Sequence, residues 1–392
     1  MKARKRILLL VLMCVCLCAF VCSGVTLIRK TLSFSLSFDG EPVFEKTYPL
    51  PFSRALRLGF YGYDLQMLCQ KRFSGDVEAC FGYLHPSILT DVESVCHRFD
   101  RPATEPTVAF SESGFSYTEG QNGLLTDVPA TLSRLLASPS SSVVYAVLTP
   151  EETVEDLKKR TVSVSFFSTS YASSSPARKK NVALAASRLS GLTVLPGEEL
   201  SFNQAVGART TENGFYEAPV IENGVYSTGV GGGVCQVATT LYVAWLYADR
   251  AVTYSRPHSL TPHYVTPGLD AMVSSSGDLV LKNDSPYPVY IRSYADGNLL
   301  SFEIFGEKPA CDVSLRSVLV KTIPCDEYET VNGGEDRILF FPKPSTLYHS
   351  YRIRAYPNGQ TSEEFLRASF YLPQKGKKSV SSRNNDEENG SQ

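Results

Sequence analysis

The sequence predicts an α+β protein with an N-terminal membrane anchor, a small α+β domain, a larger α+β domain with an antiparallel hairpin, and a small β-rich C-terminal module. Three observations lead to this fold class. An uncharged apolar run lies near the N-terminus, helical and strand-like hydrophobic patterns are mixed after it, and strand patterns dominate from about residue 315. Of the 392 residues, 43% are hydrophobic and 11% aromatic, which is enough to build folded cores.

The N-terminus predicts the compartment. Residues 1–6 carry four basic side chains, and residues 7–28 form an uncharged run that would span ~30 Å as a helix. By the positive-inside rule, we expect 1–6 in the cytoplasm, 7–28 as a transmembrane signal anchor in the cell membrane, and the bulk of the chain outside. A cleaved signal peptide is the alternative, although the run is long and no Ala-x-Ala-like site follows it.

Residues 31–165 are expected to form an N-terminal extracytoplasmic region. Its clearest helix begins at Asp127, a capping residue followed by leucines at helical spacing. The expected elements are helices at 84–96, 127–137 and 149–157 and strands at 108–110, 114–117 and 142–148. A Ser-rich stretch at 168–176 predicts a connector to the next domain.

The second domain is predicted over residues 170–307. Residues 181–191 have a helical pattern that ends at a glycine, and Asp296-Gly297 joins two strand patterns into a hairpin. Residues 315–374 carry further strand patterns and predict a small β-rich module. Residues 375–392 are polar and charged, which predicts a disordered tail.

A glycine-rich turn places a thiol where a helix begins. Gly231, Gly232 and Gly233 precede Val234-Cys235, and an apolar helical stretch follows. Glycines permit a sharp turn, and a helix N-terminus stabilises a thiolate. One hypothesis makes Cys235 a nucleophile, with His258 as its base and Asp270 as the group that orients the base. The alternative is a buried, inert cysteine, with His258 and Asp270 bonded to their own loops.

Other polar residues near this motif are candidates for substrate binding. Gln236 and Arg256 can bind a peptide carbonyl and a carboxylate, respectively, or serve as a helix cap and a solvated cation. The three glycines can form an anion-binding nest or only a tight turn. His263 can replace His258 as the base, or lie on a surface loop. The loop carboxylates Glu198 and Glu199 suggest glycosidase chemistry more weakly, since adjacent loop glutamates are usually solvated.

Charge and cysteine content exclude or disfavour other classes. A net charge of −2 without a basic aromatic stripe excludes nucleic acid as an expected partner. Outside the apolar run there are six cysteines, and in an oxidising exterior some should pair, with Cys311–Cys325 or two of the N-terminal three as local candidates. Their spacing suggests no metal site, and no cofactor is expected.

Several ordered motifs resemble the VanW family across residues 170–307. They are Arg178…Asn181, Leu195-Pro-Gly-Glu-Glu-Leu-Ser-Phe-Asn203, Val206-Gly207, the 231–242 motif, Arg256-Pro-His-Ser259, Tyr264-Val-Thr-Pro-Gly-Leu-Asp-Ala271 and Lys282-Asn283. Residues 95–165 resemble the peptidoglycan-binding-like domain that precedes many VanW domains, and residues 315–374 resemble a G5-like module. Met272 departs from the threonine usual in the family after Asp-Ala.

The resemblance implies a bacterial envelope protein of the kind found beside glycopeptide-resistance functions. The family supplies no agreed reaction or catalytic residues. We therefore expect an accessory protein that binds or acts alongside peptidoglycan or cell-wall peptides, with its membrane contact through the N-terminal helix. The alternative is a cysteine-dependent peptidase or acyl transferase that uses Cys235 and His258, and a scaffold for a protein partner is a third possibility.

Overall fold

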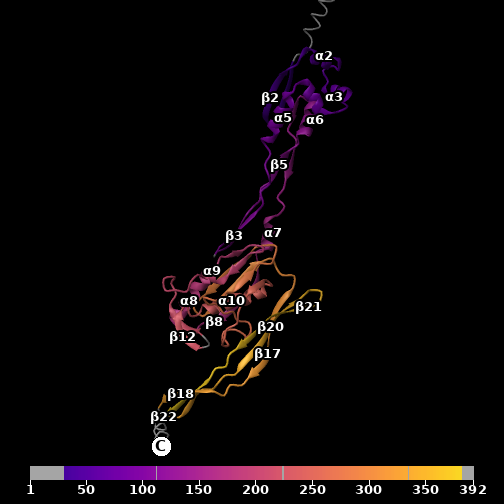
Figure 1. The fold of residues 1–392 in the computed structure, drawn as a ribbon. Helices are drawn as coiled ribbons and strands as arrows, with labels where there is room; N and C mark the ends of the chain where they lie inside the picture. Colours follow the sequence, from indigo (N-terminus) through magenta and orange to yellow (C-terminus); the bar gives the residue numbers. More distant parts are fainter. Residues whose placement is uncertain (1–30, 112, 223–224, 334, 382–392) are drawn as a thin grey trace, which may run out of the picture. The chain divides into compact units, whose positions relative to one another are not determined.

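A computed structural model describes residues 31–111, 113–222, 225–333 and 335–381 (Figure 1). The predicted cytoplasmic segment 1–6 and membrane anchor 7–28 lie outside these residues. Within the described part of the chain, no helix has the length and apolar character needed to cross a membrane. The chain divides into two units, one of residues 1–106 with 119–153 and one of residues 107–118 with 154–392.

The first unit packs helices against a three-stranded sheet of order β2-β1-β6. Its elements are β1 (Thr31–Phe38), β2 (Glu41–Pro49), α2 (Phe52–Phe60), α3 (Leu65–Phe73), α4 (Val77–Leu84), α5 (Ser87–His97), β5 (Gly123–Thr126), α6 (Val128–Ala137), β6 (Ser140–Ser142) and β7 (Tyr145–Leu148). Alternate residues of β1 are buried. The rings of Phe34 in β1 and Phe81 in α4 pack edge to face, with their centroids 5.4 Å apart. The Asp127 side chain caps α6 by accepting a hydrogen bond from the Ala130 amide, so the predicted helix start is confirmed.

The second unit contains the helix that carries Cys235. Its central sheet has the order β8-β16-β15-β9, and a smaller sheet has the order β10-β14-β13. The elements are β3 (Thr107–Ser111), β4 (Gly114–Thr118), α7 (Val154–Lys159), β8 (Val162–Ser170), α8 (Pro176–Ser187), β9 (Thr193–Val194), β10 (Glu199–Ser201), α9 (Phe202–Val206), β11 (Glu217–Glu222), β12 (Val225–Val230), α10 (Val234–Tyr247), β13 (Ala251–Tyr254), β14 (Val280–Lys282), β15 (Val289–Ala295) and β16 (Leu299–Gly306). The hairpin predicted at Asp296-Gly297 is confirmed as β15–β16.

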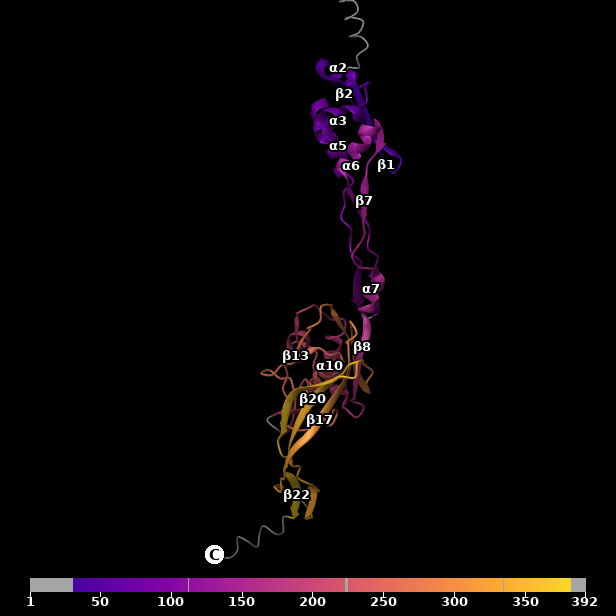
Figure 2. The ribbon, with the colours of Figure 1, turned by 90° about the vertical axis from the view of Figure 1, so that its right-hand side faces the viewer.

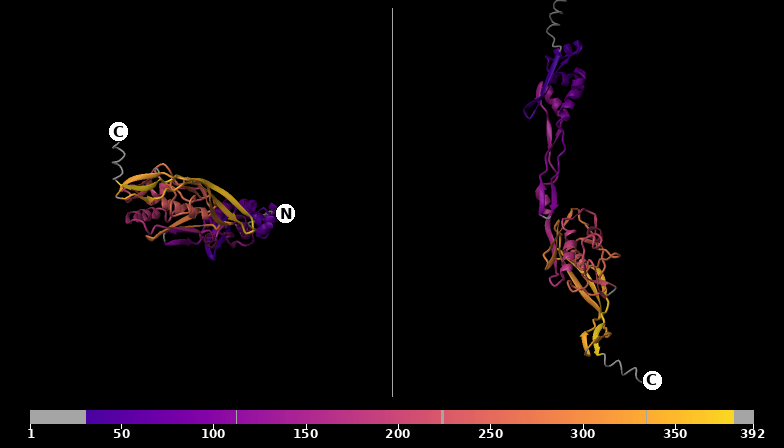
Figure 3. Two further views of the ribbon diagram at one scale, coloured as in Figure 1. Left: turned by 90° about the horizontal axis from the view of Figure 1, so that it is seen from below. Right: turned by 90° about the vertical axis from the view of Figure 1, so that its left-hand side faces the viewer.

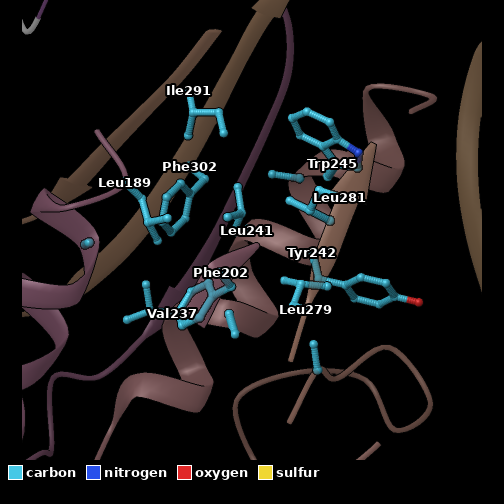
Figure 4. Close-up of a cluster of buried hydrophobic side chains, with 14 of the residues drawn as sticks. Leu189, Phe202, Val237, Leu241, Tyr242, Trp245, Leu279, Leu281, Ile291 and Phe302 are labelled. Atoms are coloured by element: carbon cyan, nitrogen blue, oxygen red, sulfur yellow. The ribbon is translucent and has the colours of Figure 1, made fainter. Parts of the chain in front are cut away.

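Helix α10 is the centre of the core. Its residues Gln236 to Leu246 are all buried, which is possible because sheet and helix surround it. Figure 4 shows Val237, Leu241 and Trp245 among side chains from the sheet and from α9. Trp245 donates a hydrogen bond from Nε1 to the Ala251 carbonyl at 2.9 Å, so its one polar atom is satisfied inside the core.

The C-terminal residues form two further sheets. Their elements are β17 (Asp312–Ile323), β18 (Tyr328–Gly333), β19 (Arg337–Phe340), β20 (Ser345–Ala355), β21 (Thr361–Tyr371) and β22 (Gly376–Ser381). The long strands pair in the order β17-β20-β21, and Figure 2 shows β17 and β20 side by side. Figure 3 shows these orange and yellow C-terminal strands from two further directions. The mixed α+β fold class and the strand-rich C-terminus expected from the sequence are both observed.

Two sequence expectations need correction. The tail predicted as disordered from residue 375 instead begins with β22, which pairs in parallel with β18 and antiparallel with β19. Backbone pairing, which composition does not reveal, holds this polar strand. The six cysteines of the described residues are all free, although some were expected to pair. Cys69, Cys80 and Cys96 are instead buried in the core of the first unit, where thiols pack as small apolar groups.

Candidate active site

The turn before α10 needs glycine at each of its three positions. Gly231 and Gly233 have φ angles of 89° and 109°, which side chains other than glycine rarely adopt. A Cβ on Gly232 would lie 2.6 Å from the Pro219 carbonyl oxygen, so β11 approaches the turn too closely for any side chain. The turn ends where α10 begins, and Cys235 follows in the first helical turn, near the free amides of the helix N-terminus.

Cys235, His258 and Asp270 lie together. The Cys235 thiol donates a hydrogen bond to the Val273 carbonyl oxygen at 3.3 Å. Cys235 and His258 line the same pocket, close enough for each to shift the pKa of the other. His258 Nδ1 lies 2.6 Å from Asp270 Oδ2, which also accepts the His258 backbone amide at 2.7 Å. Since Asp270 holds Nδ1, Nε2 is the ring nitrogen left for the thiol. This is the order of contacts of a nucleophile, a base and an orienting carboxylate.

The electrostatics favour an ion pair between the thiol and the imidazole. Burial opposes protonation of His258, but hydrogen bonds to Asp270 and Cys235 outweigh it and raise the pKa of His258 to about 9. Burial also opposes ionisation of Cys235, yet the hydrogen bond and charge of His258 lower the pKa of this thiol. For the buried Asp270, contacts with His258 overcome burial and lower the pKa of the carboxyl. The arrangement therefore favours thiolate and imidazolium together.

Two side chains of the C-terminal strand β21 hold Asp270. The Tyr371 hydroxyl donates to Asp270 Oδ1 at 2.5 Å and accepts the Gly268 amide at 2.6 Å. Arg367 donates to the Asp270 backbone carbonyl, and its Nη2 lies 3.6 Å from Oδ1. Asp270 and Tyr371 are both fully buried. The carboxylate thus has partners on both oxygens, which fixes the ring that it orients.

The thiol opens into a pocket of about 710 Å³. Cys235 and His258 line it together with the glycine turn, the β11–β12 hairpin and the loop after His258. Cys235 is partly exposed and His258 only 6% exposed, so the thiol is the accessible member of the pair. A pocket of this size accommodates a peptide-sized ligand next to the sulfur.

Comparison with known proteins identifies this region. Residues 177–305 match the family model described as VanW like protein. This region is a VanW-like domain. The domain includes Cys235, His258 and Asp270 but ends before the β21 residues that hold Asp270. The match lies within the 170–307 range over which the sequence resembles that family, whereas the resemblance of residues 95–165 to a peptidoglycan-binding-like domain stays a prediction.

Two curated relatives each match about a third of this chain. The uncharacterized protein YoaR of Bacillus subtilis (strain 168) is 38% identical over 138 residues, which cover 35% of this chain and 46% of the relative. The Vancomycin B-type resistance protein VanW of Enterococcus faecalis (strain ATCC 700802 / V583) is 27% identical over 135 residues, covering 33% of this chain and 49% of the relative. The alignments thus span about half the length of each relative. No solved structure matches.

The remaining predicted binding residues of the VanW-like domain divide between pocket and surface. Gln236 lines the pocket, but its amide is buried and bonded to Thr169, Ser170 and Arg178. Arg256 is exposed and is not among the pocket-lining residues. His263 is exposed at the pocket wall, while Asp270 bonds to His258, so His258 is the histidine in the triad position.

The loop carboxylates of the VanW-like domain are engaged elsewhere. Glu198 Oε2 accepts the Leu195 amide at 2.8 Å, and Glu199 Oε1 accepts the Thr253 hydroxyl at 2.8 Å. Neither residue lines the pocket, so the glycosidase hypothesis gains no support. In the residues that the structure describes, no cluster of three potential metal ligands occurs.

Four functional candidates were missed in the sequence. Arg178 and Arg209 line the pocket, and Tyr371 and Arg367 hold Asp270. Arg178 belongs to one of the VanW-like motifs, which is a signal that could have marked it. The two β21 residues lie about 100 positions from Asp270, and nothing in their local sequence points to that contact.

Proposed function

We propose that this chain is an extracytoplasmic envelope protein that acts on cell-wall peptides by cysteine-dependent acyl transfer, as a peptidase or acyl transferase. The observation that carries the proposal is that Cys235 and His258 line one pocket, with the His258 ring held by Asp270 through a contact of 2.6 Å between Nδ1 and Oδ2. The cell-wall context is supported by the VanW-like domain and by the name of the enterococcal relative.

The proposed reaction uses only groups at the site and an acceptor. Cys235 Sγ attacks the carbonyl carbon of a peptide bond, so a C–S bond forms and the C–N bond breaks. The thiol proton, held by His258, passes to the departing amine nitrogen. Water or a second amine then attacks the thioester, its proton returns through His258 to the thiol, and the acyl group leaves. The amides at the start of α10 favour the negative charge that develops on the attacked carbonyl oxygen.

A binding or accessory role without catalysis is the second candidate. It is favoured by the contact of Cys235 Sγ with the Val273 carbonyl oxygen at 3.3 Å, which is typical of a thiol that acts as a donor within the structure. In this case the pocket holds a wall peptide and no bond is broken. Chemistry at the sulfur therefore decides between the two candidates.

The first test measures the reactivity of Cys235 in the full-length protein. Alkylation is followed across pH with site assignment by mass spectrometry, in the wild type and in His258→Ala. We expect fast labelling with an apparent pKa below the ~8.5 of a free thiol, and loss of that low-pH labelling in the variant. A thiol that is inert in the folded protein, or equally reactive in both, refutes the nucleophile and favours the binding role.

The second test looks for the bond that changes. Purified peptidoglycan fragments are incubated with the wild type and with Cys235→Ala, and products are identified by mass spectrometry. Acyl transfer predicts new products with the wild type only, together with a mass adduct on Cys235 in a quenched reaction. Binding without product by both proteins contradicts catalysis and supports the accessory role.

The envelope location is part of the same proposal. It is supported by the basic residues 1–6 and the uncharged run 7–28, which favour a single-pass anchor with the bulk of the chain outside. Cell fractionation followed by protease treatment of intact spheroplasts tests it. Recovery in the membrane fraction with the folded part digested from outside is expected, and a protease-protected soluble protein contradicts it.

A further inference from the structure

The pocket beside Cys235 is lined by positive or titratable basic groups and by no acidic one. Arg178 and Arg209 lie in its wall with His258 and His263, while no Asp or Glu of the described ranges lines it. The rest of the lining is apolar or neutral. Since the whole chain has a net charge of −2, this concentration of positive charge is local to the pocket and favours an anionic ligand.

Arg178 is held in place by neutral partners. Its Nη1 donates to the Ser174 hydroxyl at 2.7 Å, and its Nη2 donates to Gln236 Oε1 at 2.8 Å. Its stem packs against the glycine turn, where a Cβ on Gly233 would lie 3.0 Å from Arg178 Cγ. No carboxylate of the described chain forms an ion pair with this guanidinium. Arg178 is therefore fixed in position without a carboxylate partner from the described part of the chain.

Arg209 lies against the other end of the same turn. A Cβ on Gly231 would lie 2.8 Å from Arg209 Cβ, so that glycine also makes room for an arginine stem. Arg209 Nη2 donates to Asn203 Oδ1 at 2.5 Å. The Asp278 carboxylate, whose charge favours the protonated form of Arg209 and so raises its pKa against the effect of burial, accepts hydrogen bonds from the Ser201 hydroxyl at 2.6 Å and the Asn203 amide at 2.9 Å. Over the described residues, Arg209 also has no carboxylate ion-pair partner.

Both arginines are close enough to the sulfur to interact with it electrostatically. Burial lowers the pKa of Arg178 and of Arg209, and in each case the charge of Cys235 opposes this effect. The Arg209 charge in turn contributes to the lowered pKa of Cys235. An anion held by the two guanidiniums would therefore lie beside the nucleophile rather than in a remote part of the pocket.

We propose that Arg178 and Arg209 bind a free carboxylate of the acyl donor, so that the substrate is a peptide whose scissile carbonyl lies next to a terminal, carboxylate-bearing residue. This inference rests on the proposed function. Planar guanidinium groups match the geometry of a carboxylate, and charge-assisted hydrogen bonds are the strong ones in a partly buried site. The amine released on attack by Cys235 then belongs to the residue that carries the carboxylate.

Binding to full-length Cys235→Ala protein tests the inference without turnover. The probes are N-acetyl-dialanine as the free acid and as its carboxamide, in the L,L and D,D forms, titrated calorimetrically. We expect the acid of at least one stereoisomer to bind about tenfold or more tightly than its amide. Equal binding of acid and amide, or binding of neither, overturns the carboxylate site.

Substitution of the arginines assigns the preference to the two side chains. Arg178→Gln and Arg209→Gln, each in the Cys235→Ala background, should lose the preference for the acid, whereas Arg337→Gln, an exposed arginine of β19, should keep it. A preference that survives both pocket substitutions overturns the assignment. Thermal melting identifies a variant that fails to fold, and the comparison of acid with amide on the unsubstituted pocket does not depend on these variants.

The failure of this inference is separable from failure of the proposed function. Cys235 alkylation in the wild type reports the nucleophile, while the acid and amide probes report the carboxylate site. If the thiol is reactive but the acid and amide probes bind equally, only the proposed substrate class is refuted. If the thiol is unreactive but the protein binds the acid probe more tightly than the amide, the carboxylate site is supported and the proposed acyl transfer is refuted.

Discussion

Replacing Asp270 with Asn removes the negative charge behind His258 while keeping the shape of the side chain. The Asn carbonyl can take the place of Oδ2 and accept both the backbone amide and the Nδ1–H of His258. The amide nitrogen then faces the Tyr371 hydroxyl, which still accepts the Gly268 amide and has a second lone pair for the new donor. The ring should therefore keep its orientation and lose its counter-charge.

The size of the effect follows from the pKa of His258. Its rise from 6.5 to about 9 corresponds to about 3 kcal/mol in favour of the imidazolium, with Asp270 the first of the contacts that outweigh burial. Without that charge, burial of the ring favours the neutral form, and the thiolate of Cys235 loses its partner. A thiol with a pKa of ~8.5 is about 1% ionised at pH 6.5, so alkylation there should fall by up to about 100-fold.

The assay is the alkylation rate of Cys235 from pH 5.5 to 9.5 in full-length wild type and Asp270→Asn. We expect the alkylation rate of Asp270→Asn to fall below that of the wild type at pH 6.5. At pH 9.5, where a free thiol is ionised as well, the two rates should be nearly equal. The matched control is Asp91→Asn in the first unit, which also removes a carboxylate bonded to a tyrosine hydroxyl and a cation. Superimposable profiles for wild type and Asp270→Asn would refute the reasoning that Asp270 sets the thiolate.

Three further predictions follow from the same contacts. Because the pKa of His258 is raised to about 9, the Tm advantage of wild type over His258→Gln should be full below pH 6.5 and disappear as the pH rises through 9; a constant difference contradicts the charge pairing. Tyr371→Phe should lower the free energy of unfolding in urea by ~1–3 kcal/mol and reduce low-pH alkylation of Cys235 less than Asp270→Asn does, whereas an unchanged pH profile would give Tyr371 a structural role only. Gly233→Ala should cost ~2–5 kcal/mol, since strain at φ 109° adds to a contact at 2.9 Å, while Gly297→Ala, at φ 91° with open space, should cost only the ~1–2 kcal/mol of strain; equal Tm losses contradict the steric argument.

Much of the local structure could be predicted because its signals are close in sequence. The Asp127 cap, the Asp296-Gly297 turn and the glycine run before α10 each act over a few residues, and each lies where it was expected. Helix α7 begins at Val154, later than the helix predicted from Thr149, because element ends depend on contacts that local patterns do not contain.

The candidate site was predictable in its chemistry and only partly in its members. Cys235, His258 and Asp270 could be named because a nucleophilic thiol needs a base and an orienting carboxylate, and His258 and His263 are the histidines of the domain sequence. Arg256 was named for carboxylate binding, yet Arg178 lines the pocket. Charge type alone does not distinguish an arginine on the surface from one held beneath a glycine turn.

The sequence by itself determined the fold class, the nucleophile candidate and the VanW-like character of the second domain. Hydrophobic periodicity, turn residues and ordered motifs can each be recognised from residues that are close together in the chain. Only the tertiary structure decided that β21 places Tyr371 and Arg367 on Asp270, about 100 residues away. It also decided that Arg178 and Arg209 line the pocket of the thiol, with no carboxylate ion-pair partner among the residues that the structure describes. These contacts depend on how strands and loops pack, and packing joins residues whose separation along the chain carries no local signal.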